Sequence, residues 1–190
     1  ENEQIGEMNE EQRNLIDSIK EDASRLLKIT GELLNMTQVE SGNIQLGIIP
    51  SDPMEILNYA VNANKTIAEQ KKVKLEISAE EKLPKVLADS EKTAWVLTNL
   101  ISNAIRYSYD NSTVLISVKS GSSKIYFVVK DTGQGIAPQY KEKIFDRYFR
   151  IPGSQKEGTG LGLSISQEFI EAQGGQISVE SDFGAGGIFT

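Results

Sequence analysis

The hydrophobic pattern of the sequence changes once, near residue 43, and this change limits the folds open to the chain. Residues 9–41 contain no proline, and apolar side chains recur there at helical spacing, with Ile19, Leu26 and Leu33 seven residues apart. The pattern predicts one long amphipathic helix that ends at the Ser-Gly-Asn break at 41–43. We therefore expect a helical segment (1–43) followed by a second domain (44–190).

Two interpretations of this helix remain open. It packs on its own domain, or it is an arm of a helix bundle or coiled-coil dimer. The wide apolar stripe and the lack of a preceding strand favour the arm, although Asp22 interrupts an otherwise apolar column and argues against a strict coiled coil.

Beyond the break, helical and alternating segments occur in mixed order. Strands are expected at 44–49, 73–77, 86–87, 113–119, 124–130 and 176–180, and helices at 53–71, 90–107 and 161–172, with a short helix after Pro138. A hairpin-like turn at 120–123 joins two of the strands, so the pattern predicts an α+β domain rather than a doubly wound sheet.

Composition excludes several classes of function. The net charge is −7, from 20 Lys+Arg and 27 Asp+Glu, which disfavours general binding to nucleic acid or anionic lipid. No apolar run approaches the ~18 residues of a membrane span. The chain has no cysteine and no histidine, which excludes disulfides, thiolate or histidine metal sites and Ser-His hydrolysis.

One predicted helix carries two amides and a cation on a single face. Asn99 and Asn103 lie four residues apart and Arg106 follows three residues later, so all three project from one side of helix 90–107. An amide oxygen suits a hard cation, and nucleotide-bound Mg²⁺ takes one or two protein oxygens besides phosphate and water. Asn103 is therefore a candidate ligand, while an ordinary surface position explains each amide taken alone.

A carboxylate at the end of a predicted strand is followed by two glycines. Asp131 comes directly after strand 124–130, and Gly133 and Gly135 follow it. The carboxylate can accept a hydrogen bond from an exocyclic amine, and the glycines let backbone approach a flat ring. The combination suits adenine, and a glycine turn capped by Asp131 is the alternative.

A glycine triplet precedes the predicted helix 161–172. Unpaired amides at a helix N-terminus bind phosphate, although the spacing of Gly158, Gly160 and Gly162 fits neither a P-loop nor a dinucleotide fingerprint. Just upstream, residues 144–150 combine aromatic side chains with two arginines. Arg150 is placed to reach phosphate oxygens when this segment closes, whereas core packing plus surface charge is the alternative.

Taken together and in this order, the segments 99–104 (NLISNA), 131–135 (DTGQG), 145–150 (FDRYFR) and 158–163 (GTGLGL) resemble the N, G1, F and G2 boxes of sensor histidine kinases. Residues 9–46, with LLNMTQVESG at 33–42, are similar to the second helix of that family's dimerisation and phosphotransfer hairpin. The resemblance implies a Bergerat-type α/β sandwich, with a mixed sheet and helices on one face, preceded by the long helix. It implies ATP and Mg²⁺ binding and transfer of the γ-phosphoryl group to a histidine that this chain does not contain.

The resemblance also implies residue roles. Asn103 would hold the metal, Asp131 would read the adenine amine, and Asn99, Arg106 and Arg150 would act in phosphoryl transfer. The remaining implied nucleotide contacts are Tyr107, Gly133, Gly135, Ile136, Gly158, Thr159, Gly160, Leu161, Gly162 and Leu163, with residues 151–157 as a lid over the phosphates. Two positions depart from the family pattern, since Trp95 stands where a glutamine is common and Arg106 where a lysine is common.

The implied partners are ATP, a response-regulator receiver domain docking near the first helix, and a second copy of the full-length chain, in a cytoplasmic location. No nucleic acid and no direct membrane contact are expected. With half of the hairpin outside the chain, Leu26 and Leu33 are expected to be exposed and to cause weak self-association. Two other classes stay open: an ATP-driven machine related to type II topoisomerases, heat-shock chaperones or mismatch-repair ATPases, which commonly carry glutamate at the position of Asn99, and a docking module with a degenerate pocket.

Overall fold

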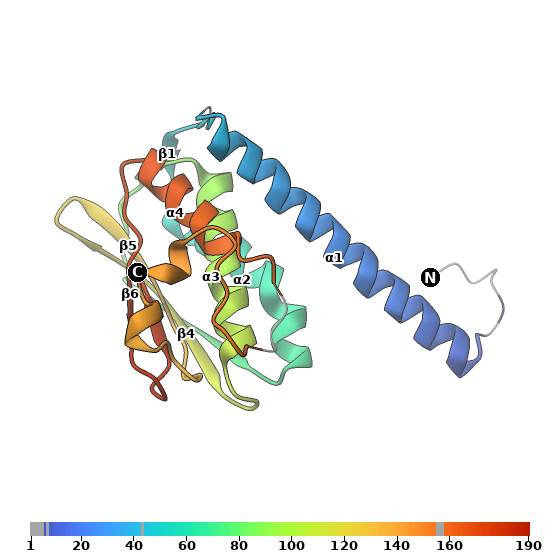
Figure 1. Ribbon diagram of the computed structural model, residues 1–190. Helices are drawn as coiled ribbons and strands as arrows, with labels where there is room; N and C mark the ends of the chain where they lie inside the picture. The colour runs from blue at the N-terminus through green and yellow to red at the C-terminus, as the bar shows by residue number, and fades with distance from the viewer. Residues whose placement is uncertain (1–5, 7, 43, 155–157) are drawn as a thin grey trace.

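The computed structural model describes residues 6, 8–42, 44–154 and 158–190. A long helix, α1 (Glu10–Glu40), precedes a layered domain in which helices cover one face of a β-sheet (Figure 1). The predicted α+β class, with a mixed sheet and helices on one face, is confirmed.

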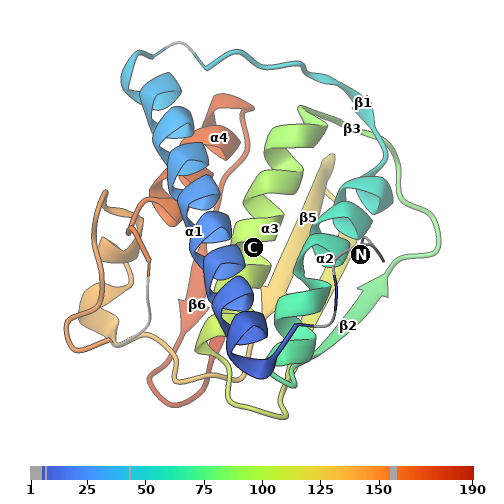
Figure 2. The same cartoon turned by 90° about the vertical axis from the view of Figure 1, so that its right-hand side faces the viewer.

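Helix α1 begins and ends as its sequence predicts. Asn9 caps its N-terminus in a reciprocal capping box with Gln12, and Gly42, at φ +63°, follows its end. Asn43, the last residue of the predicted break, lies outside the described residues. Figures 1 and 2 show the end of α1 beside α4 (Gly162–Ala172), and Figure 1 shows the helix diverging from the domain towards its N-terminus.

The packing of α1 divides its apolar residues into two groups. Met36 and Val39, near its C-terminal end, are buried against the domain. Leu26 is 64% exposed and Leu33 is 48% exposed, as predicted for these two residues. The last turns of α1 therefore pack on the domain and the rest of the stripe is open, while the role of α1 as a bundle or coiled-coil arm stays a prediction.

The main sheet has five strands in the order β2-β4-β5-β7-β6. Strand β2 (Lys74–Ala79) runs parallel to β4 (Thr113–Gly121), while β5 (Lys124–Lys130), β7 (Gly187–Phe189) and β6 (Val179–Ser181) continue in antiparallel fashion. The β4–β5 turn is tighter than predicted: Ser122 and Ser123 occupy it at φ +50° and +62°, the signature of a two-residue hairpin turn.

The helix layer and the sheet enclose the core. Helices α2 (Pro53–Gln70) and α3 (Ser90–Tyr107) pack together with α4 over the sheet. Ile101 and Ile105 of α3 meet Ile116 and Val129 of the sheet in this core. Trp95, on the same helix, packs edge-to-face on Phe169 of α4 with ring centroids 5.6 Å apart. The tryptophan that stands where the family commonly has glutamine therefore packs α3 against α4.

Two predicted strand positions are corrected, and one strand is added. The strand expected at 44–49 is absent, because Gly47 N donates to the Asp89 carboxylate at the start of α3 instead of joining a ladder, and β1 (Ile49–Ser51) pairs with β3 (Val86–Ala88) as a separate two-stranded sheet. The strand expected at 176–180 is shorter and begins at Val179. The sequence pattern places no strand after Gly184, but the structure forms β7 there, between β5 and β6.

The other predicted elements agree to within a few residues. The short helix after Pro138 is observed as two 3-10 turns, Pro138–Tyr140 and Lys143–Phe145. Among the described residues, no helix combines the length and the apolar character that crossing a bilayer requires.

Candidate nucleotide site

Helix α3 provides the first group of predicted site residues. Asp89 caps its N-terminus by accepting from Lys92 N at 2.9 Å, and the helix then runs without interruption to Tyr107. Asn99 is buried, and its Nδ2 donates to Ser166 Oγ on α4 at 3.0 Å. The α3 face that carries Asn103 and Arg106 therefore stands at a fixed distance from the start of α4.

The loop after β5 provides the second group. Asp131 is buried, its carboxylate accepts from Gly133 N at 2.8 Å, and its own N donates to Gly187 O at 2.9 Å. Burial raises the pKa of the Asp131 carboxyl, although hydrogen bonds from the backbone of Gly133 and Gly187 oppose the shift. A buried carboxyl with so few partners is suited to accept from a ligand.

Two glycines in this loop are required by close backbone contacts rather than by a ligand. A Cβ at Gly133 would lie 2.2 Å from Tyr107 O, and a Cβ at Gly135, whose φ is +68°, would lie 2.0 Å from Asp182 O. The loop is thereby pressed between the end of α3 and the segment after β6. Ile136 N donates to Ser181 Oγ at 2.9 Å and completes this attachment.

The glycine segment before α4 provides the third group. Gly160 has φ +77°, and its carbonyl accepts from Tyr148 N at 2.9 Å. A Cβ at Gly158 would lie 3.2 Å from Nη1 of Arg106, so this segment touches the α3 cation. Gly162 lies directly against the Asn99 side chain.

These three groups meet around one cavity of about 530 Å³. Most of the predicted site residues line it: Asn99, Asn103, Arg106, Tyr107, Asp131, Gly135, Ile136, Arg150, Gly158, Thr159, Gly160, Gly162 and Leu163. Gly133 and Leu161 do not. Gly133 supports the loop from behind, and Leu161 is buried in the core.

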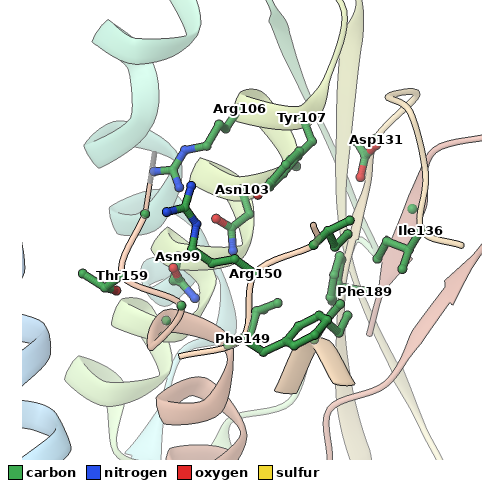
Figure 3. Close-up of a pocket in the computed structure, with 18 of the residues that line it drawn as sticks. Asn99, Asn103, Arg106, Tyr107, Asp131, Ile136, Phe149, Arg150, Thr159 and Phe189 are labelled. Carbon is green, nitrogen blue, oxygen red and sulfur yellow. The ribbon is translucent and has the colours of Figure 1, made fainter. Parts of the chain in front are cut away.

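The two ends of the cavity differ in charge. Figure 3 shows Arg106 and Arg150 on one side, Asp131 and Ile136 on the opposite side, and Asn103 between them. The cationic side is suited to phosphate and the acidic, partly apolar side to a base. The cavity therefore fits a ligand with a base at one end and phosphates at the other.

Comparison with known proteins agrees with this geometry. Residues 88–190 match the family described as histidine kinase-, DNA gyrase B- and HSP90-like ATPase. The chain belongs to this family.

Individual relatives narrow the assignment within the family. Sensor histidine kinase ZraS of Salmonella typhi is 33% identical over 181 residues, which are 95% of this chain and 37% of ZraS. The circadian input-output histidine kinase CikA of Synechococcus elongatus is 28% identical over 191 residues, 98% of this chain and 25% of CikA. The crystal structure of full-length ShkA in complex with AMPPNP matches with a TM-score of 0.81 and 26% identity, over 97% of this chain and 39% of ShkA.

The chain thus carries the catalytic ATP-binding domain of a sensor histidine kinase, as the resemblance of its four boxes predicts, and it spans well under half the length of ZraS and CikA. Residues 151–154 of the predicted lid are described and include Ile151, which lines the cavity, whereas 155–157 lie outside the described residues.

Several lining residues of this ATP-binding domain are missing from the prediction. Arg25, Ile29 and Glu32 of α1 reach the cavity, and the Thr159 hydroxyl donates to the buried Glu32 carboxylate across 127 positions of sequence. The others are Ala104, Ile144, Phe149, Gly187 and Phe189. No local pattern signals the α1 contribution, because it depends on how α1 docks beside α4.

Proposed function

We propose that this chain is the catalytic part of a sensor histidine kinase that transfers the γ-phosphoryl group of ATP to a histidine outside the chain. The observation that carries the proposal is that Asp131 and Asn103 face one cavity whose far side holds Arg106 and Arg150. The 190 residues contain no histidine, so the acceptor must come from elsewhere.

At the acidic end, the Asp131 carboxylate would accept from the exocyclic amine of adenine. The carboxyl is buried, so a correctly placed donor replaces solvation that the folded chain has already lost. Ile136 and Phe189 would flank the flat ring with apolar surface.

At the cationic end, Arg106 and Arg150 would neutralise phosphate oxygens, and the Gly158–Gly162 segment would approach them with its backbone. Phosphoryl transfer requires mainly positioning and charge neutralisation, which this set of groups can supply.

Asn103 would supply the one protein oxygen for Mg²⁺. Among the described residues there is no cluster of three or more acidic side chains that could hold a metal, so the donor set fits an ion whose other ligands are phosphate and water. When bound, the ion would neutralise charge on the transferred group.

A hydrolytic machine of the same fold is less well supported. Water activation needs a general base, and Asn99 is an amide whose Nδ2 donates to Ser166 Oγ. Asn99 would instead hold the ligand or the glycine segment in place.

The proposed partners follow from the whole kinase rather than from this chain. They are a response-regulator receiver domain and a second copy of the full-length protein, through the exposed stripe of α1. The ATP requirement supports a cytoplasmic location.

Calorimetric titration with a non-hydrolysable ATP analogue, with and without Mg²⁺, tests the proposal. We expect saturable binding by the parent chain. Asp131→Ala should weaken binding in both conditions, because the adenine contact is lost. Asn103→Ala should weaken it mainly when Mg²⁺ is present.

Matched controls are Asp110→Ala and Asn62→Ala, which remove the same groups at exposed positions. Both should bind like the parent. The proposal fails if the parent shows no saturable binding, or if Asp131→Ala binds as tightly as Asp110→Ala. A longer chain that includes an acceptor histidine should become labelled from γ-labelled ATP, and the absence of label on it would also count against the proposal.

A further inference from the structure

The ammonium group of Lys71 lies at the C-terminal end of a neighbouring helix. Lys71 is the C-cap residue of α2, and its side chain extends to the end of α3. Its Nζ donates to the carbonyl oxygens of Ile105 at 2.6 Å, Arg106 at 2.5 Å and Ser108 at 2.7 Å. One cation from α2 therefore binds three carbonyls at the end of α3.

The end of α3 needs such a partner. The last carbonyls of an α-helix have no amide four residues ahead to pair with, and a cation there also opposes the helix dipole. In α3, the Ser108 amide donates back to Ala104 O and closes the final turn. Ile105 and Ser108 are buried, so a protein group rather than bulk water must donate hydrogen bonds to their carbonyl oxygens.

The same turn carries part of the nucleotide site. Arg106 and Tyr107 line the cavity, while Lys71 does not. The Tyr107 carbonyl touches Gly133 of the Asp131 loop, and Nη1 of Arg106 lies beside Gly158. The end of α3 is thus the point at which α2, the Asp131 loop and the glycine segment meet.

We propose that Lys71 is a positioning residue for the phosphate end of the site: by binding the carbonyls at the end of α3, it fixes the turn that aims Arg106 into the cavity. This inference rests on the proposed nucleotide function. It concerns a side chain that does not contact the ligand and that acts through the backbone of its neighbour.

The test is a double-mutant cycle between Lys71→Met and Arg106→Ala, read by calorimetric titration with the ATP analogue and with adenosine. Lys71→Met should weaken binding of the analogue by about tenfold, the order of magnitude of one charge-assisted hydrogen bond, and leave adenosine binding nearly unchanged. In the Arg106→Ala background the same substitution should have little further effect, because the group it positions is gone.

Two further variants keep the test informative if Lys71→Met unfolds. Lys71→Arg retains a cationic donor and should restore most of the affinity, and Lys71→Gln retains neutral donors and should restore part of it. Lys65→Met removes an exposed lysine from the same helix and should match the parent. Amide hydrogen exchange without nucleotide should be faster in residues 105–109 of folded Lys71→Met or Lys71→Gln than in the same residues of the parent.

The outcomes separate this inference from the proposed function. If the parent and Lys65→Met bind no analogue, the proposed function fails. If both bind and Lys71→Met or Lys71→Gln binds equally well, only the role of Lys71 is overturned. Equal losses for the analogue and adenosine, or full additivity with Arg106→Ala, would also overturn it, since a general loss of packing predicts both.

Discussion

Substitution of Gly162 by alanine should change the affinity for an ATP analogue more than it changes the free energy of unfolding. Gly162 is the first residue of α4 and lies against the Asn99 side chain. A Cβ built on it would lie 2.6 Å from Oδ1 and 2.9 Å from Nδ2 of Asn99, closer than such atoms can approach. In Gly162→Ala the amide must therefore turn away while the backbone keeps its path.

The expected change in the free energy of unfolding is small. Turning Asn99 away breaks its 3.0 Å hydrogen bond to Ser166 Oγ, which costs about 0.5–1.5 kcal/mol. Alanine in place of glycine near the start of a helix offsets at most about 1 kcal/mol of this. The net loss should therefore not exceed about 1.5 kcal/mol, and each 1 kcal/mol corresponds to a Tm shift of about 2–4 °C in a domain of this size.

The expected change in affinity is larger. If Asn99 lies beside the phosphates, its displacement removes a polar contact and moves an amide towards the ligand, so binding of the ATP analogue should weaken by about tenfold or more. Thermal denaturation and calorimetric titration of the same samples measure the two effects.

Ser166→Ala is the matched control for Gly162→Ala. It removes the partner of Asn99, together with the hydrogen bond from Ser166 Oγ to Gly162 O, without adding a methyl group against the amide, so it should destabilise the domain at least as much and lower affinity much less. If Gly162→Ala binds as tightly as the parent, or loses no more affinity than Ser166→Ala, then the placement of Asn99 does not govern binding.

Three other perturbations have defined outcomes. Burial raises the pKa of the Asp131 carboxyl in the folded state, so the stability that this group contributes is full below its unfolded pKa and is lost as the pH rises through its folded pKa. Urea unfolding across that window should show a flatter pH dependence for Asp131→Asn than for the parent. Parallel curves would contradict a raised pKa at Asp131. The buried Ser108 hydroxyl has no hydrogen-bond partner within the described part of the chain, so Ser108→Ala should leave the free energy of unfolding within about 0.5 kcal/mol of the parent or raise it, and a loss above about 1 kcal/mol would reveal a partner. The exposed stripe of α1 should cause weak self-association that Leu26→Glu combined with Leu33→Glu abolishes at little cost to Tm, and sedimentation of the parent as a clean monomer at high concentration would refute this.

The sequence predicts the features of this fold that are local. Helix α3 has an Asp89 cap and an unbroken apolar face, and both α3 and α1 begin and end close to where the pattern places them. The shared cavity of Asp131 and Asn103 is also predicted, because four motifs in a fixed order resemble those of a known family.

The features that the sequence does not predict depend on contacts between distant segments. The segment before β1 is apolar enough for a strand, but its Gly47 amide pairs with the cap of α3. Strand β7 is short and follows two glycines, and its neighbours on both sides define it. Glu32 enters the cavity only because the end of α1 docks on the domain, and helical periodicity gives no sign of it.

The position of β7 has a consequence for how the site tolerates change. Strand β7 pairs with the end of β5, and Asp131 N donates to Gly187 O, so the long excursion from Asp131 to Gly187 starts and finishes at one point of the sheet. Most of this excursion is folded, and the entropy of closing the exposed loop around Gly153 within it grows only with the logarithm of that loop's length. Residues can therefore be inserted at the exposed Gly153, close to the cavity-lining Ile151, while the sheet that holds Asp131 keeps its register.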